Sequence, residues 1–529
     1  MTPGLAETQS YRSTLPPARD GFRHVLLAEF TKLRTVRGWI AALVIGALLI
    51  VGIGFLSAAG SQRECLTPNG SAHGKACGSQ APLVGPDGQP VTDNFYFVHQ
   101  TLDGDGSITV RVTSLSEQVS PSGGGGPDAS ASWQAGVVPW AKAGLIVKAN
   151  TTQGSAYAAI MATSRHGVRM QYDYTHDVAG SATPVSKASP QWLRLTRAGD
   201  TLTGYESADG NTWTTVGVAK LTGMPASVQA GLFVTSPDYD VTTEEIVGTS
   251  TSGGPSKATA AFDNVSVQGR QSPGSWQGTQ IGDEGVGNLP PFTQSDRTFT
   301  VTGSGDIGPA ASSGGDNNTI AGSLVGAFVG LMAMVVLGAL FVTAEYRRGL
   351  IRTTLVASPR RGRVLAAKAI VLGSVVFVFG LAASAFTMWF VDGQRRNNGT
   401  YILPASSQTE IRVIVGTAAL LAVTSVFALA VGTILRRSAT AVATVIVLVV
   451  LPYILAVSSV GALQWLLRLT PAAGFAVQQT LHRYPQVDGV YIASAGYFPL
   501  SPWEGFGVLL GWTALALGLA IFLLRKRDA

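Results

Sequence analysis

The stretch that decides the fold class is IAGSLVGAFVGLMAMVVLGALFVTAEYRRGLIRTTLVASPRRGRVLAAK, residues 320–368. Its first 24 residues carry no charge, and a helix of that length can cross a bilayer core of about 30 Å. Seven basic residues follow before the stretch ends. An uncharged apolar run that leads into a basic segment predicts a membrane span followed by a cytoplasmic loop.

Five further apolar stretches of similar length lie outside this segment. Only 13% of the residues are charged and the mean hydropathy is +0.27, which argues against an ordinary soluble enzyme. Length and number exclude the buried helices of a soluble protein, and the first stretch is too long for the apolar part of a cleaved signal peptide. We therefore predict six transmembrane helices, at residues 39–59, 320–343, 364–391, 411–435, 440–460 and 503–524.

A long polar insertion separates the first predicted span from the second. It covers residues 61–318 and has a net charge of −8, whereas the rest of the chain has a net charge of +14. Most basic residues outside the insertion lie on one side of six spans, which predicts that this side, with both termini, is cytoplasmic. The insertion is then extracytoplasmic, in a multi-pass protein of the plasma membrane. Because the basic residues flank the spans, they do not indicate nucleic-acid binding.

The insertion changes from helical to alternating periodicity between residues 91 and 270. Short β-branched and aromatic runs recur about ten times, and turn sequences such as Gly199-Asp200 and Asp209-Gly210 separate many of them. This pattern predicts an all-β sandwich or jelly roll. We expect a linker at residues 61–90 before it and a Gly/Ser/Pro-rich tether at residues 271–318 after it.

Two cysteines and two acidic residues in the insertion are candidate structural sites. Outside the cytoplasm, a disulfide between Cys65 and Cys77 is the leading interpretation. Two free thiols, or a metal site that includes His73, are the alternatives, although the spacing matches no standard zinc pattern. Asp103-Gly-Asp105-Gly could supply calcium ligands, but it lacks the spacing of an EF-hand loop and is better explained as a tight turn.

Four phrases of the insertion resemble concanavalin A-like, laminin-G-like sandwich domains of bacterial secreted proteins. They are PWAKAGLIVKAN (139–150), QWLRLTRAGDTLTGYESADGNTW (191–213), AGLFVTS (230–236) and AAFDNVSV (260–267). The resemblance implies a fold rather than a function, because such domains bind sugars, proteins or no known ligand. Exposed aromatic rings would suit a sugar platform, and packing in the core or on a sheet face is the alternative. The candidates are Trp133, Trp140, Tyr172, Tyr174, Trp192 and Trp213.

Residues 22–37, which precede the first span, have apolar side chains on one helical face. That face comprises Phe22, Val25, Leu26, Phe30 and Leu33. The pattern predicts an amphipathic helix at the cytoplasmic interface, within an N-terminal segment 1–37. A simple extension of the first span, which we place at 38–60, is the alternative.

The chain closely resembles the permease subunits of type-2 ATP-binding-cassette exporters. The matching phrases are AEFTKLRTVRGW (28–39), the basic loop quoted above, LTPAAGFAVQQT (469–480), PLSPWEGFGVLLGW (499–512) and LLRKRDA (523–529). The smallest members of this family lack the long insertion. The resemblance implies an α-helical membrane protein, a six-helix half-transporter with an interfacial elbow helix. It also implies short re-entrant helices before the last span, for which residues 461–500 within 319–529 are the candidate.

The resemblance further implies that the first cytoplasmic loop, residues 345–363, docks on a separate ATPase. Glu345 is the lone acid of this loop, and we expect it to pair with an arginine of the loop or of the ATPase. Contact with lipid headgroups and a role in membrane orientation are the alternative. The predicted ATPase-coupling residues are Glu345, Arg347, Arg348, Arg352, Arg360 and Arg361.

The sequence contains no G-x-x-x-x-G-K-[ST] phosphate loop, no HExxH and no GxSxG. We expect a non-enzymatic chain that binds no cofactor, with ATP and magnesium held by a partner ATPase. A second permease copy or paralogue, forming a dimer, and membrane lipids are the other expected partners. One alternative is a membrane-anchored recognition or sensor protein, for which five spans after the insertion are excessive. Another is a membrane-bound glycan enzyme, for which no pair of catalytic carboxylates stands out.

Overall fold

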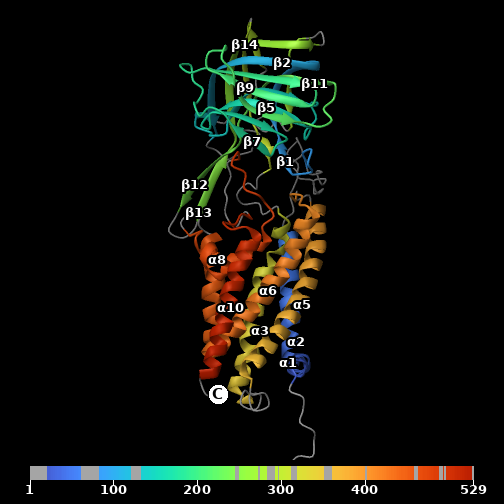
Figure 1. Ribbon diagram of the computed structural model, residues 1–529, viewed down its shortest axis with the longest axis vertical. Coiled ribbons are helices and arrows are strands. Elements are labelled where there is room, and N and C mark those ends of the chain that lie inside the picture. The colour runs from blue at the N-terminus through green and yellow to red at the C-terminus, as the bar shows by residue number, and fades with distance from the viewer. Residues whose placement is uncertain are drawn as a thin grey trace, which may run out of the picture.

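A β-rich domain stands on one end of a bundle of long helices (Figure 1). The computed structural model describes residues 21–60, 83–120, 133–244, 249–271, 275–282, 292–295, 297–310, 319–350, 360–398, 402–457, 463–487, 493 and 496–526. Both cysteines and Arg352 lie outside these residues, so the predicted disulfide and the role of Arg352 stay predictions. We call the end of the bundle that is far from the β-rich domain its distal end.

Six helical segments of the described chain are long and apolar enough to cross a membrane, which confirms the predicted helical membrane part. Each overlaps one predicted span, and the bounds differ by one to six residues at one or both ends. The distal end holds the last described residues of the final helix (Figure 1). The segments are α2 (Arg37–Ala59), α3 (Gly326–Arg347), α5 (Arg361–Asn397), α6 (Ser407–Leu435), Ser438–Val457 and α10 (Pro502–Lys526).

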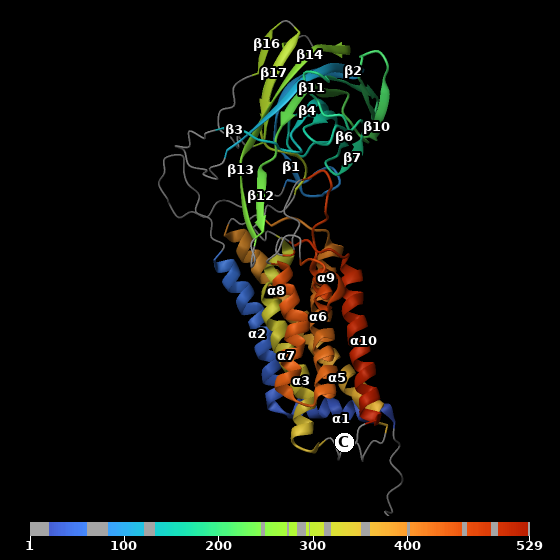
Figure 2. The same cartoon turned by 90° about the vertical axis from the view of Figure 1, so that its left-hand side faces the viewer.

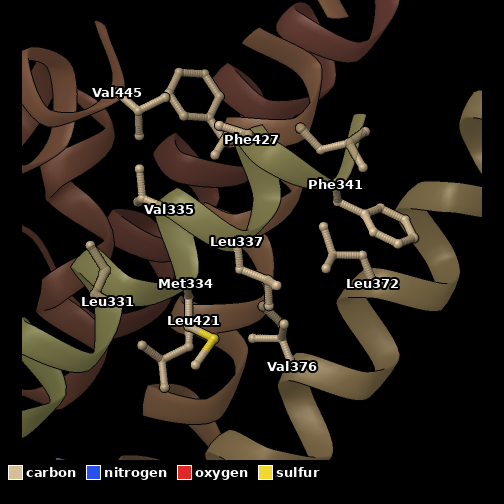
Figure 3. Close-up of a cluster of buried hydrophobic side chains, with 14 of the residues drawn as sticks. Leu331, Met334, Val335, Leu337, Phe341, Leu372, Val376, Leu421, Phe427 and Val445 are labelled. Carbon is tan, nitrogen blue, oxygen red and sulfur yellow. The ribbon is translucent and has the colours of Figure 1, made fainter. Parts of the chain in front are cut away.

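Apolar side chains of α3 form the centre of the bundle. Figure 3 shows Leu337 facing Leu372 and Val376 of α5, while other α3 side chains turn towards α6 and α7 (Ser438–Val445). Gly338 lets α3 approach α6 closely, because a Cβ at this position would lie 2.2 Å from the carbonyl oxygen of Ser425. Packing between helices thus holds the bundle together where the hydrophobic effect of water is absent.

The fifth apolar segment is not a uniform α-helix. A π-helical turn, η2 (Ile446–Val450), separates α7 from α8 (Leu451–Val457). Pro452 follows this turn and has no backbone N–H to donate, so the regular i→i−4 pattern is interrupted at this point. The helical axis therefore has a built-in irregularity in its second half.

Short helices lie between the fifth and sixth apolar segments, within residues 461–500. They are α9 (Leu466–Leu469) and the 3-10 helix η3 (Pro471–Gln478), and nearly all side chains of η3 are buried. Trp512 of α10 donates a hydrogen bond to the carbonyl of Leu469 at 2.9 Å, and Arg412 of α6 donates to the carbonyl of Gln479 at 2.6 Å. Side chains of the neighbouring helices therefore satisfy backbone groups that apolar surroundings could not satisfy. A second 3-10 helix, η1 (Ile320–Leu324), precedes α3.

The helix α1 (Phe22–Thr35) lies across the distal end of the bundle (Figure 2). The residues of the predicted apolar face differ in burial within the chain, because Leu33 is buried whereas Phe30 is 45% exposed. Glu29 is buried together with Leu33, on the side of α1 that faces the bundle. The helix is thus rotated so that a carboxylate, rather than a phenyl ring, faces the bundle.

The β-rich domain is organised around one long strand, β2 (Phe95–Val119). Its first half pairs with β11 (Ser227–Thr235) and β15 (Gln277–Ile281), and its second half pairs with β8 (Gln191–Ala198) and β14 (Ser256–Gln271). The larger sheet is completed by β3 (Gln134–Ala135), β4 (Lys142–Lys148), β5 (Tyr157–Thr163), β6 (Val168–Tyr172), β7 (His176–Ala179), β9 (Thr201–Ser207), β10 (Thr214–Lys220), β16 (Thr293–Ser295) and β17 (Thr298–Gly303). Two smaller pairs are β12 (Tyr239–Glu244) with β13 (Thr249–Gly254) and β1 (Val91–Asp93) with β18 (Ile307–Pro309).

Alternating side chains give this sheet its main core. In β8, Leu193 and Leu195 are fully buried while the residues between them are half-exposed, as expected for a strand with one buried face. They share a core with Leu145 of β4 and Ile160 of β5. The opposite side chains of β4 and β5 form a second core, which β1 and β18 cover.

The prediction of a tight turn at Asp103-Gly-Asp105-Gly is wrong. β2 continues through these residues, and the irregularity is a bulge at which Asp103 pairs with Arg270 and Gly106 pairs with Gly269. Gly104 has φ of 73°, which glycine adopts without strain. The carboxylates serve the local structure, because Asp103 accepts from Ser227 Oγ at 2.5 Å and Asp105 accepts from the Gly199 backbone N–H at 2.7 Å.

The described part of residues 271–318, which the sequence predicts to be a tether, contains four strands. One of them, β17, pairs with β14 in the main sheet, and β18 closes the pair with β1. Asp306 in this segment also binds the side chain of Lys142, which is completely buried in β4, at 2.6 Å. The β structure therefore extends to Pro309.

We predict that residues 83–310 expressed alone fold as a soluble all-β domain, and that residues 91–270 alone are much less stable. The shorter fragment lacks Asp306 and so leaves Lys142 as a buried, unpaired cation, which costs about 3–5 kcal/mol. Circular dichroism and urea unfolding measure both fragments. Equal unfolding midpoints, or a coil-like spectrum for residues 83–310, would contradict this description of the domain.

Candidate functional site

The distal end of the bundle brings together three elements that are far apart in sequence. Here α3 ends, α5 begins and α1 crosses beside them (Figure 2). Residues 345–350 and 360–363 of the predicted coupling loop are described, and residues 351–359 lie outside the described part. The ionisable side chains of this end are the candidate site.

Among the described residues, Glu345 pairs with two lysines, whereas the expected pair with an arginine of the loop or of the ATPase stays a prediction. Its Oε1 atom lies 2.6 Å from Lys368 Nζ of α5 and 3.3 Å from Lys32 Nζ of α1. Lys368 and Lys32 come from two different helices, so the carboxylate at the end of α3 connects α3 to both of them. Its Oε2 atom is buried and has no hydrogen-bond partner among the described residues.

Glu29 completes a group of four charges. Its Oε2 accepts from Lys368 at 2.7 Å and its Oε1 accepts from Lys32 at 2.9 Å. Each carboxylate thus binds both ammonium groups, and the four charges sum to zero. We call Glu29, Lys32, Glu345 and Lys368 the base cluster.

The base cluster is largely removed from solvent. The side chains of Lys368 and Glu29 are each only 2% exposed, and Glu345 is 12% exposed. Lys368 Nζ also lies 5.0 Å from the ring centroid of Phe341. Burial penalises an unpaired charge by several kcal/mol, so removing one member of the cluster leaves its partners in an unfavourable environment.

Lys32 is the most exposed member of the cluster. Burial by itself would lower its pKa, but the hydrogen bonds and the negative charges of Glu29 and Glu345 outweigh this effect and raise the pKa above its usual value. Lys32 is therefore a cation at neutral pH and completes the charge balance of the cluster.

The sequence points to Glu345, the lone acid of the loop, whereas nothing in it marks Glu29 or Lys368 as members of a site. Glu29 occupies a helical position beside the apolar face of α1, where an acid is also typical of the solvated side of an amphipathic helix. Lys368 lies near the start of the third predicted span, 364–391, and is counted among the seven basic residues of the preceding loop. Their partnership depends on how α1 crosses α5, which no local pattern encodes.

The predicted coupling arginines differ in their surroundings. Arg347, Arg348 and Arg360 are exposed at the distal end, with neighbouring Arg363 and Arg437. Arg361 instead donates to the carbonyl of Leu524 at 2.6 Å and thereby connects the start of α5 to the end of α10. We call Arg347, Arg348 and Arg360 the exposed arginine group.

The aromatic residues that could form a sugar platform differ in exposure, and Lys257 Nζ lies 4.3 Å from the ring centroid of half-exposed Trp133. Trp140 and Tyr174 are buried, and Tyr172 stacks on His176. Trp192 and Trp213 are half-exposed and are each covered by an arginine, with Arg194 only 3.9 Å above the Trp213 ring. Sheet-face packing accounts for the described contacts of these rings.

Within the described residues, no group of three or more His, Cys, Asp or Glu side chains is arranged to hold a metal ion. Asp103 and Asp105 accept hydrogen bonds from the protein, as described above. The ionisable groups gathered at the distal end are therefore a structural and electrostatic site, built from paired charges.

The fold and this site define a multi-pass membrane protein with a β-rich insertion and a charged distal end. A family model described as "ABC-2 family transporter protein" matches residues 214–529, from the start of β10 to the C-terminus. The chain belongs to this family, whose members are membrane components of ABC transporters. No curated protein matches the sequence.

Solved structures give a weaker comparison. A scytalido-glutamic peptidase with a transition state analog inhibitor is 11% identical, with 40% of this chain and 98% of that chain covered and a TM-score of 0.24. A functionally unknown protein from Saccharomyces cerevisiae is 16% identical, with 40% and 97% covered and a TM-score of 0.21. At TM-scores this low, neither likeness carries a conclusion about fold or function.

Proposed function

We propose that this chain is the membrane-spanning permease subunit of an ATP-driven exporter, working as a dimer with a separate ATPase. Family membership supports the role of a permease component. The observation that carries the coupling assignment is the base cluster, which joins α1, α3 and α5 through buried ion pairs. Such a cluster suits an element that must transmit force without deforming.

We place the distal end in the cytoplasm and the β-rich domain outside. The exposed arginine group and the ends of α6 and α10 concentrate basic residues at the distal end, whereas the insertion is acidic. Cytoplasmic ends of membrane spans carry an excess of lysine and arginine. In this orientation, α1 lies at the inner membrane surface, where it can contact lipid headgroups.

In the proposed mechanism, the ATPase docks on the exposed arginine group and pushes on the ends of α3 and α5. Because the base cluster ties these ends to α1, the three elements move together. The buried Oε2 of Glu345 is a suitable acceptor for an arginine of the ATPase or for Arg352 of the loop. The chain itself contributes positioning and transmission, while ATP and magnesium belong to the partner.

For the insertion, we propose a concanavalin A-like sandwich that recognises the exported molecule or cell-wall material outside the membrane. The support is a sheet that turns back on itself through β2 and shares one core between β4, β5, β8 and β9. A disulfide between Cys65 and Cys77 would restrain the entry to this domain. Calcium plays no part in this proposal.

We predict that changing Arg347, Arg348 and Arg360 together to alanine reduces co-purification of the ATPase at least tenfold. Losing several charge contacts at a docking surface weakens association by about 1 kcal/mol or more each when they are desolvated. The matched control removes three exposed cations of the β-rich domain, Lys187, Lys220 and Arg270, by the same substitution. Equal ATPase recovery from both variants would show that the arginines serve membrane orientation only.

A further inference from the structure

The β-rich domain contacts the helical part at a defined point. The side chain of Gln486, in the segment before α10, donates a hydrogen bond from Nε2 to the backbone carbonyl of Thr175 at 2.9 Å. Thr175 lies in the turn between β6 and β7, and Gln486 is only 2% exposed. A buried amide is costly unless it is paired, so this hydrogen bond favours one relative position of the turn and the segment.

The turn that presents this carbonyl is held firmly within the β-rich domain. Tyr174 donates its hydroxyl to Asp93 Oδ2 at 2.7 Å, and Lys148 Nζ lies 2.7 Å from the same oxygen. Asp173 and Tyr174 have φ of 44° and 65°, a left-handed conformation that non-glycine residues keep only when their surroundings impose it. Asp93 belongs to β1, so the turn is fixed to the strand that leads into the domain.

Apolar contacts lie beside this hydrogen bond. Val487 Cγ2 approaches Gly308 of β18 so closely that a Cβ there would be in van der Waals contact, at 3.9 Å. Ala310, just after β18, packs on Leu403, Leu481 and Tyr497 of the helical part. Residues of β18 and the residue after it thus contact the segment 481–487, and the turn between β6 and β7 forms a hydrogen bond with the same segment.

The other end of this segment is fixed to the bundle. Arg412 of α6 donates to the carbonyls of Val477 and Gln479, and Gln478 donates to Thr417 Oγ1 at 3.0 Å. Only residues 480–485 separate these anchors from Gln486. A displacement of the turn is therefore transmitted over a short, tethered piece of chain to η3, which lies buried between α6 and α10.

We propose that the hydrogen bond between Gln486 and Thr175 is a mechanical link through which the β-rich domain controls the position of η3. A molecule that binds the domain and shifts the turn would thereby change the position of η3, which lies in the segment between the fifth and sixth spans. The regulatory meaning of the link rests on the proposed function of the permease. Its existence depends only on contacts within this chain.

Hydrogen–deuterium exchange of the full chain in lipid nanodiscs tests the link. Tyr174→Phe keeps the ring but removes the hydroxyl that holds the turn to Asp93. We expect amides of residues 479–487 to exchange about three- to tenfold faster in this variant, which is the effect of losing one hydrogen bond. Gln486→Leu breaks the link from the membrane side, and it should speed exchange both in η3 and at residues 172–176.

The matched control is Asp263→Asn, which weakens the two-point contact between Asp263 and Arg111 elsewhere in the β-rich domain. It should leave exchange of residues 479–487 unchanged. The proposal is overturned if Tyr174→Phe loosens only the turn and Gln486→Leu changes neither side, or if the control loosens residues 479–487 equally. The experiment uses neither ATP nor an ATPase. A negative result in this experiment would not contradict the proposed function as a permease. Likewise, a failure to find an ATPase partner would not contradict the link between Gln486 and Thr175.

Discussion

Replacing Lys368 by methionine is expected to destabilise the helical bundle by about 3–5 kcal/mol, the usual cost of breaking a buried ion pair from one side. The substitution keeps the length of the side chain but leaves the carboxylates of Glu29 and Glu345 facing each other with only half-exposed Lys32 between them. Two buried carboxylates close together repel, and neither can be solvated by water. The ties of α1 to α3 and α5 should therefore weaken.

Thermal unfolding of the purified chain in detergent, followed by tryptophan fluorescence, measures this loss. Arg348→Met is the matched control, because Arg348 is exposed at the same end and its loss should change stability by no more than about 0.5 kcal/mol. Adding Glu29→Gln and Glu345→Gln to Lys368→Met removes the stranded charges and should restore most of the stability. If Lys368→Met unfolds at the same temperature as the parent, the base cluster is not a stabilising unit.

Lys148→Met should have an effect of similar size in the β-rich domain. Lys148 and Asp93 are both completely buried, 2.7 Å apart, and Lys148 also donates to the carbonyl of Ser155. Desolvation by burial lowers the pKa of Lys148, while Asp93 opposes this lowering, so the cation depends on its partner. Without the lysine, Asp93 becomes a buried unpaired acid, which costs about 3–5 kcal/mol.

Urea unfolding of residues 83–310 measures this second effect. Lys187→Met, at an exposed position of the same domain, is the control and should leave the midpoint unchanged. The combination of Lys148→Met with Asp93→Asn should recover part of the loss, because it removes the stranded charge. An unchanged midpoint for Lys148→Met alone would show that this ion pair does not stabilise the position of β1.

The helical part of the fold could be predicted because length and hydrophobicity alone decide it. An apolar run of more than 20 residues with at most one charge has few other structures available, and each of the six runs is mainly helical in the structure. The alternating pattern of β8 was equally informative, since a strand with one buried face must alternate. These features depend on near neighbours in the sequence.

Features that depend on distant partners could not be predicted in this way. The Asp103-Gly sequence has the composition of a turn, but pairing with β11, β14 and β8 on both sides keeps β2 extended and turns the glycine into a bulge. Glu29 looks like an ordinary charge of an amphipathic helix until α5 places Lys368 beside it. The four strands within residues 271–318 are also short, and β15, β17 and β18 pair with strands that come much earlier in the chain.

Affinity purification of the full chain from its native membrane in mild detergent tests the central proposal most directly. The account predicts that an ABC ATPase with a phosphate-binding loop co-purifies in near-equal amount, and that the purified complex hydrolyses ATP. It also predicts that the triple alanine variant of Arg347, Arg348 and Arg360 loses this partner. Recovery of the intact, folded chain with no ATP-binding subunit and no ATP hydrolysis would contradict the proposed role as a permease subunit of an ATP-driven exporter.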